Sequence, residues 1–346
     1  MASARNVSLP VRLLVTVGAF LLAVRLLGAA TATAAPAVAP LLRSASHANA
    51  LGLGWLAAYA LANGSVVAAV GLSLFAAGAL GAGQLFFVVA GSRLGAAAVV
   101  VLVGAMYYAQ RRRGRLREAV SLGLLAFLVT HTVYLPATAL GALALAPLEG
   151  RLAARAPLDA GTRPVGPLAA LARAVVDAVG PFAAGALAVA LLFAALRLFD
   201  QVLAGAESAA TRRLLGRLER VWVSFLAGLA VTALATSVAF SLGAVVPLFN
   251  RGYVERDDLV PYVLGANLGT LADSLLVAAV LGTPTGGALV LVLVAAAGAV
   301  TVAALVRVGG YRRAVATAHD RLLRDPRALA GFAVLLIVVP VALLAL

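Results

Sequence analysis

The chain has 346 residues, of which 63% are hydrophobic and 12% are charged, and its mean hydropathy is +1.06. Because a soluble domain carries about 25% charged residues, this composition excludes a water-soluble enzyme, and the absence of cysteine excludes a disulfide scaffold. All 27 basic residues are arginines against 13 acids, and their clusters between apolar runs follow the positive-inside rule rather than a nucleic-acid-binding stripe.

Seven apolar segments reach the length of about 20 residues that a helix needs to cross a bilayer. In chain order they are Val11–Ala35, Leu85–Ala109, Ala119–Ala146, Ala174–Phe199, Leu259–Leu281, Gly287–Val306 and Leu329–Leu346. Residues 1–35 are either a retained helix or a cleaved signal peptide, and we favour the helix because Arg25 interrupts the apolar run late. The pattern predicts an all-α polytopic membrane protein.

Two further apolar stretches are interrupted by small polar residues near their middles. Asn63-Gly64-Ser65 divides Leu51–Leu80, while Thr236-Ser237 and Ser241 divide Val221–Phe249. Each arm is long enough to reach about the middle of a membrane. Each stretch is therefore either an ordinary span with a few polar residues or a re-entrant hairpin that returns to its own side.

Three arginine clusters, at residues 111–117, 212–220 and 307–327, decide between these topologies. If both interrupted stretches cross the membrane, no orientation puts all three clusters on one side, whereas all three are cytoplasmic if both stretches are re-entrant and the N-terminus is cytoplasmic. We therefore expect a multi-pass protein of the cell membrane with a single transport domain, residues 1–346. Its predicted parts are a first half (11–146, hairpin about 51–80), an exterior connector (147–172), a second half (173–306, hairpin about 221–249), a cytoplasmic basic segment (307–328) and a terminal transmembrane helix (329–346).

The two interrupted stretches belong to an internal repeat that keeps one constant offset along the chain. A gap-free shift of the chain against itself aligns Gly54, Gly91 and Gly95 with Gly228, Gly265 and Gly269. If the halves are inverted, the equivalent of residues 111–117 lies outside and should lack arginine, and residues 285–291 indeed read TGGALVL. Inverted repeats with broken helices are typical of secondary transporters, in which half-helix N-termini face anions and unwound carbonyls or hydroxyls coordinate cations.

Each half of the repeat carries a short motif at the same distance after the polar interruption. In the second half Gly228–Ser241 reads GLAVTALATSVAFS, and Gly265–Thr270, which reads GANLGT, begins 29 residues after Thr236. In the first half GSRLGA, which begins at Gly91, follows Ala62 at the same distance. These motifs resemble those of the sodium/phosphate cotransporter (Na/Pi symporter) family, in which each half carries Gly-x-x-x-Thr-Ala-x-x-Gln-Ser-Ser-Ser-Ala-Thr and Gly-Ala-Asn-Ile-Gly-Thr follows the Gln at this distance.

This chain departs from the family pattern at defined positions within the resemblance, which covers about residues 10–305. Ala62 and Thr236 replace the Gln, and Asn63-Gly64-Ser65 and Ser237-Val238-Ala239 replace the Ser triplets. In the first half Arg93 replaces the Asn.

The resemblance implies sodium-coupled uptake of inorganic phosphate or a related oxyanion through a lipid bilayer. No cofactor is expected besides the sodium ion, which would bind at Thr236, Ser237 and Asn267. The expected substrate- and ion-binding residues are Asn63, Gly64, Ser65, Arg93, Thr236, Ser237, Ser241, Asn267, Thr270 and Asp273.

Arg93 and Asp273 are charges inside predicted spans. One charge at the bilayer centre costs about 2.5 to 3.5 kcal/mol even on the lenient scale, so both need compensation. Three interpretations are open: Arg93 binds an oxyanion, Arg93 pairs with Asp273 and replaces a sodium ion by a fixed cation, or Arg93 snorkels to water at the membrane edge.

Two other functions compete with transport. The altered Gln-Ser-Ser-Ser motifs are also compatible with a transport-incompetent or regulatory membrane protein that retains the cotransporter fold. A membrane-embedded enzyme is disfavoured because no HExxH, Gly-x-Ser-x-Gly, P-loop or carboxylate pair occurs.

Overall fold

The computed structural model describes residues 9–111, 116–147, 166–205, 220–235, 241 and 255–346. Within these ranges all regular structure is helical and no strand occurs. Seven helices are long and apolar enough to cross a membrane: Leu9–Arg43, Ala82–Leu102, Val120–Leu145, Pro181–Val202, Arg256–Leu281, Pro284–Val306 and Pro326–Leu343. The predicted all-α polytopic fold is confirmed, and each of the seven predicted segments overlaps one of these helices.

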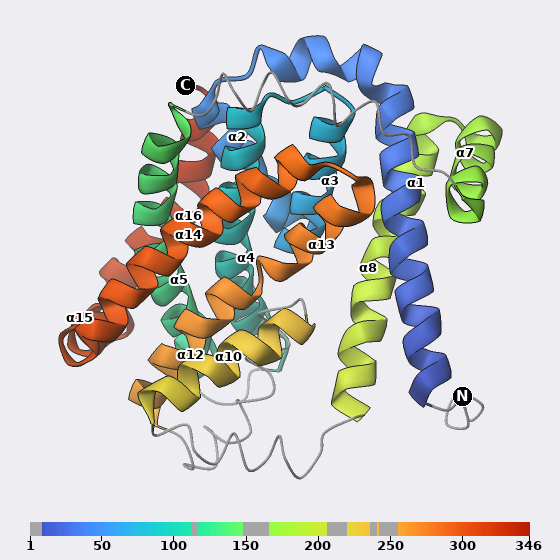
Figure 1. Cartoon of the computed structure of the whole chain (residues 1–346). Helices are drawn as coiled ribbons and strands as arrows, with labels where there is room; N and C mark the ends of the chain where they lie inside the picture. Colours follow the sequence, from blue (N-terminus) through green and yellow to red (C-terminus); the bar gives the residue numbers. More distant parts are fainter. Residues whose placement is uncertain (1–8, 112–115, 148–165, 206–219, 236–240, 242–254) are drawn as a thin grey trace.

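The helices occur in the following order along the chain (Figure 1). They are α1 (Leu9–Arg43), α2 (His47–Leu61), α3 (Gly64–Ala76), α4 (Ala82–Arg111), α5 (Leu116–Leu145), α7 (Pro167–Val179), α8 (Pro181–Gly205), α10 (Val221–Ala235), α12 (Arg256–Gly269), α13 (Ala272–Leu281), α14 (Pro284–Val306), α15 (Val308–Arg324) and α16 (Pro326–Leu343).

The segment predicted as one span at Ala174–Phe199 is instead divided at Gly180. Gly180 has a φ of +81°, a conformation that glycine adopts without steric penalty, and Pro181 at the first position of α8 cannot continue the preceding helix. Helix α7 begins at Pro167, within the predicted connector, and packs against α1. The predicted boundary between connector and span was therefore wrong, and the span is Pro181–Val202.

Helices α2 and α3 form a helical hairpin against α4. The backbone of α2 approaches α4 so closely that a methyl group on Gly91 or Gly95 would overlap the carbonyl oxygen of Leu51 or Trp55. The chain reverses at Ala62, whose φ is +49°, and α3 then returns along α4, from Ser92 beside Gly64 to Val88 beside Gly71. The turn consequently lies beside the middle of the span Ala82–Leu102.

The second half repeats the α2–α4 packing contact for contact in α10 and α12. Three glycines face a backbone carbonyl of the opposite helix in each half, at equivalent positions of the sequence repeat. The pairs are Gly54–Val88 and Gly228–Tyr262, Gly91–Leu51 and Gly265–Phe225, and Gly95–Trp55 and Gly269–Leu229. Only glycine permits this approach, so the sequence repeat encodes a repeated backbone packing.

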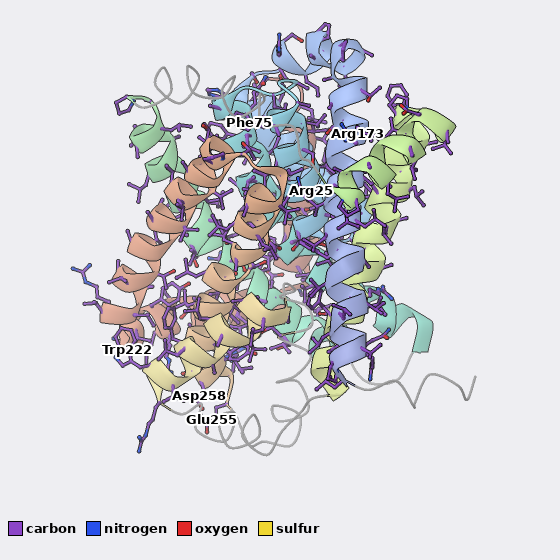
Figure 2. All side chains as sticks on the ribbon, turned by 45° about the vertical axis from the view of Figure 1, so that its right-hand side comes forward. Arg25, Phe75, Arg173, Trp222, Glu255 and Asp258 are labelled. Atoms are coloured by element: carbon purple, nitrogen blue, oxygen red, sulfur yellow. The ribbon has the colours of Figure 1, made fainter. Side chains whose placement is uncertain are left out.

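The two halves have opposite orientations. Helices α2 and α3 lie at the upper end of the molecule in Figure 1 and α10 lies at the lower end, while α1 and α8 run side by side in opposite directions. Figure 2 likewise places Phe75, near the end of α3, above, and Trp222 and Asp258 below. Contacts between the halves are reciprocal, because α4 contacts α14 and α12 contacts the equivalent helix α5. This geometry is that of an inverted repeat.

Helix α15, within the predicted basic segment, ties the two halves together at the lower end (Figure 1). The buried ring of His319 contacts the carbonyl of Ser121 on α5 through Nε2 at 3.0 Å and Nη1 of Arg256 through Nδ1 at 3.0 Å. Arg256, the first residue of α12, also donates to Asp320 at 2.6 Å. Hydrogen bonding from Arg256 lowers the pKa of the Asp320 carboxyl, so this carboxylate stays charged under mildly acidic conditions.

Candidate functional site

The span Arg256–Leu281, predicted as Leu259–Leu281, contains a local interruption at Thr270–Leu271, where the GANLGT motif ends. Helix α12 ends at Gly269 and α13 begins at Ala272 without a side-chain cap. The two glycines of the motif weaken the helix locally. Asn267, Thr270 and Ser274 follow one another at helical spacings of three and four, so they share one face of α12–α13.

Arg93, near the middle of α4, crosses from the first half to this break in the second half. Its Nη1 donates to the carbonyl oxygen of Thr270 at 3.1 Å and to Thr270 Oγ1 at 2.8 Å. Its Nη2 donates to Asp273 Oδ1 at 3.2 Å and to Ser274 Oγ at 2.8 Å. The side chain thereby supplies donors to both sides of the broken helix, including a carbonyl at its C-terminal end.

The Arg93–Asp273 ion pair is buried, with side chains 2% and 3% exposed. The interpretation that Arg93 snorkels to water is therefore wrong, because its guanidinium is enclosed by protein. Of the other two interpretations, the structure contains the contact with Asp273, and protein oxygens surround both terminal nitrogens. A buried pair of this kind is stabilising only while both partners are present, since removal of either leaves an uncompensated charge.

Three atoms in this region are buried and have no hydrogen-bond partner among the described residues: Arg93 Nε, Asp273 Oδ2 and Asn267 Nδ2. Buried polar atoms are nearly always satisfied in folded proteins, so such atoms at one site demand an explanation. Two of them are donors and one is an acceptor. They give the site unused capacity to bind both an anion and a cation.

Helix α5 completes the surroundings of Asn267. Thr130 Oγ1 donates to Asn267 Oδ1 at 2.9 Å, and the Tyr134 hydroxyl donates to the Asn267 carbonyl at 2.6 Å. The sequence interpretation missed Thr130, Tyr134 and Ser274 as parts of this site. The polar group around residues 130–134, inside an otherwise apolar span, was a signal for the first two; Ser274 carried no signal beyond its position next to Asp273.

Asn63, Gly64 and Ser65 lie at the turn between α2 and α3. Asn63 Oδ1 accepts hydrogen bonds from the backbone N–H groups of Ser65 and Val66 at 2.9 and 3.2 Å, so it caps α3 with its own side chain. Gly64 packs on the backbone of Ser92, the residue before Arg93. This turn therefore neighbours the Arg93 site through α4, with two of the first N–H groups of α3 already satisfied.

The remaining predicted residues do not join the Arg93 contacts. Ser241 accepts a hydrogen bond from Thr232 at 2.7 Å and contacts the Tyr262 hydroxyl at 2.8 Å, so it belongs to the contact between α10 and α12. Thr236 and Ser237 lie outside the described residues. The structure thus brings Arg93, Thr270 and Asp273 into direct contact, with Asn267 one turn away.

The seven long apolar helices among the described residues indicate a multi-pass membrane protein, and a buried polar contact joins the two halves of its repeat. Residues 191–340 match the family model described as Na+/Pi-cotransporter, so this part of the chain is similar to that family. The family is one of transporters, not of enzymes, and the resemblance identified from the motifs is confirmed. The matched range contains GANLGT and Asp273, whereas Arg93 lies before it. No curated protein and no solved structure matches the chain.

Proposed function

We propose that this protein is a secondary active transporter that uses a sodium gradient to take up inorganic phosphate or a related oxyanion across the cell membrane. The observation that carries the proposal is the contact of Arg93, from one repeat, with the broken helix of the other repeat at a buried position. The match to the Na+/Pi-cotransporter family supplies the substrate class and the coupling ion.

The proposed transport domain contains two re-entrant hairpins and a cytoplasmic N-terminus. The turn at Ala62 and Asn63 lies beside the middle of a candidate span, which supports a hairpin that enters and leaves on the same side. The beginning of α1 and the arginine-containing α15 both lie at the lower end in Figure 1, as the positive-inside rule requires if that end is cytoplasmic.

The proposed binding residues are those that the sequence singled out, and they differ in how strongly the geometry supports them. Arg93, Asn267, Thr270 and Asp273 are supported by mutual proximity and by unsatisfied polar atoms. Asn63, Gly64 and Ser65 are supported by their position beside Ser92. Thr236, Ser237 and Ser241 complete the proposal, with sodium at Thr236, Ser237 and Asn267, on the resemblance alone.

Flux through reconstituted vesicles tests this function. Purified protein in liposomes should accumulate labelled phosphate when an inward sodium gradient is imposed and should not do so with choline in place of sodium. Excess unlabelled arsenate or sulfate in the same assay identifies related oxyanions by competition. Equal accumulation in protein-free vesicles would overturn the proposal.

One observation favours a second candidate, a transport-incompetent or regulatory membrane protein that retains the fold. Asn63 satisfies the N-terminus of α3 itself, and protein oxygens surround both terminal nitrogens of Arg93, so much of the donor capacity is already used. The vesicle assay separates the two candidates, because this alternative predicts no anion flux and no thermal stabilisation of the purified protein by phosphate, arsenate or sulfate.

A further inference from the structure

The guanidinium of Arg93 donates hydrogen bonds to a group of oxygen atoms. Its four contacts are one backbone carbonyl, two hydroxyls and one carboxylate oxygen, all contributed by residues 270–274 of the broken helix. Unwound carbonyls and helix C-terminal ends are the groups that coordinate sodium in transporters with broken helices. Thr270 lies between the last residue of α12 and the first of α13, and its carbonyl oxygen accepts from Arg93.

This group of oxygen atoms also contains one buried oxygen that Arg93 does not contact. Asp273 Oδ2 is buried and has no partner among the described residues, although the other oxygen of the same carboxylate accepts from both Arg93 and Ser274. The set therefore offers a small cation a further ligand. It carries a single negative charge, which matches a monovalent ion.

We infer that a sodium ion, distinct from the one proposed at Thr236, Ser237 and Asn267, competes with the Arg93 guanidinium for these oxygens at the α12–α13 break, so that sodium binding releases Arg93 to bind the transported oxyanion. The inference rests on the proposed function and adds the mechanism by which the two substrates are coupled. The described structure corresponds to the state in which Arg93 is the occupant.

Charge balance makes this exchange cooperative. With Arg93 on Asp273 the site is neutral, and a buried anion would be uncompensated there. When sodium takes the place of Arg93 on Asp273, the guanidinium becomes an unpaired buried cation with five N–H donors, which is the group best suited to a bidentate oxyanion contact. Each ion therefore relieves the electrostatic penalty of the other, and by linkage each raises the affinity for the other.

The exchange is confined to one half of the repeat. The residue equivalent to Arg93 in the second half is Asn267, which is neutral. The positions equivalent to Thr270, Asp273 and Ser274 are Ala96, Val99 and Val100, whose side chains contain no oxygen. The pseudo-symmetric position thus lacks both the tethered cation and the oxygen set.

Thermal unfolding of the purified full-length protein tests this inference. The unfolding temperature is measured in sodium chloride and in choline chloride, each with and without inorganic phosphate. We expect phosphate to stabilise the wild-type protein in sodium but not in choline. In Arg93→Ala the competitor is gone, so sodium should stabilise the variant at lower concentrations. The sodium concentration that gives half of the maximal stabilisation, the sodium midpoint, should be about tenfold lower than in the wild type, and phosphate should have no effect on stability. Arg43→Ala is a matched control, because Arg43 is an exposed arginine that donates to a backbone carbonyl elsewhere.

Arg93→Lys keeps the measurement informative if Arg93→Ala does not fold, because a single ammonium should compete less well and give an intermediate sodium midpoint. An unchanged sodium midpoint in Arg93→Ala or, failing that, in Arg93→Lys would overturn the inference, as would equal stabilisation of the wild type by phosphate in choline. Sodium competition without flux in vesicles would contradict the proposed function alone. Sodium-driven flux without competition would contradict this inference alone.

Discussion

The two halves of this protein share a backbone packing and differ in one charge. In both, a 15-residue helix, α2 or α10, packs through glycines onto α4 or α12, with the same three glycine–carbonyl contacts at equivalent positions of the repeat. At one equivalent position of the repeat the first half has Arg93, on α4, and the second has Asn267, near the end of α12. The glycine positions therefore maintain the symmetric framework, while the difference between Arg93 and Asn267 at equivalent positions introduces the asymmetry on which the proposed coupling depends.

The difference extends to the helices that carry these residues. Helix α4 continues without a break from Ala82 to Arg111, whereas its counterpart is broken between Gly269 and Ala272. Arg93 donates to the Thr270 carbonyl and to Asp273 on either side of this break. The intact helix therefore supplies the guanidinium that donates hydrogen bonds to the polar groups at the interruption of its counterpart.

Asp273→Ala should produce the largest loss, because it leaves the buried Arg93 without its counter-charge. We expect the free energy of unfolding in detergent to fall by about 3 to 5 kcal/mol. The double variant Arg93→Met/Asp273→Leu removes both charges and should recover most of that stability while remaining inactive in transport. A double variant as unstable as Asp273→Ala would show that the loss does not arise from the unpaired charge.

Gly91→Ala and Gly265→Ala should destabilise the two halves equally, because each added methyl group would overlap a backbone carbonyl at an equivalent position. The expected loss is about 2 to 3 kcal/mol for each, measured by chemical unfolding. Gly298→Ala on α14 is the matched control, since nothing lies within 4 Å of the added atom, and its stability should not decrease. A large loss of unfolding free energy in only one of the two variants would contradict the structural equivalence of the two halves.

The turn of the first hairpin offers two substitutions with opposite signs. Asn63→Ala removes the cap of α3 and should cost about 1 kcal/mol. Ala62→Gly relieves a left-handed backbone conformation at φ +49° and should stabilise the protein by up to about 1 kcal/mol. Thermal unfolding of the two single variants measures both effects, and destabilisation by Ala62→Gly would contradict the described turn.

The smallest effect concerns the contact of α15 with α12 at the lower end. The hydrogen bond from Arg256 lowers the pKa of Asp320 in the folded protein. The contribution of the Asp320 carboxylate to the free energy of unfolding is therefore fully present above its unfolded-state pKa, and it is lost as pH falls through the lower folded-state pKa. Because the Asp320 side chain is 37% exposed, solvent screening should keep this contribution below about 1 kcal/mol. Asp320→Asn should therefore be slightly less stable than wild type near neutral pH and equally stable in strong acid, by thermal unfolding. A stability difference that persists in acid would contradict this assignment.

Much of the fold follows from sequence because its determinants are local. Hydrophobic length alone placed the seven spans, and the polar group at Asn63 marked the turn between α2 and α3. The internal repeat could be found because glycine is needed wherever two helix backbones touch, so the same packing required the same residues twice. Hydropathy averages over Gly180 and Thr270, so it indicated neither the separation of α7 from the span Pro181–Val202 nor the local interruption within the span Arg256–Leu281.

The candidate site was less accessible to prediction. The need to compensate two charges inside spans indicated Arg93 and Asp273, and their contact follows from the inverted repeat. The partners Thr130, Tyr134 and Ser274 depend on how α5 and α13 pack, which no local pattern specifies. The contact of Ser241 with Tyr262 could not be predicted either, because it is a tertiary contact.

We expect the decisive result from the initial rate of sodium-driven phosphate uptake into liposomes. Wild-type protein and Arg93→Ala are compared in this assay, because Arg93 makes the contact that is proposed as the transport site. If the contact between the two halves is the transport site, the wild-type protein should take up phosphate in a sodium-dependent manner. The Arg93→Ala protein, reconstituted at equal density and orientation, should show no uptake above that of protein-free vesicles. Near-normal uptake by Arg93→Ala would contradict the account.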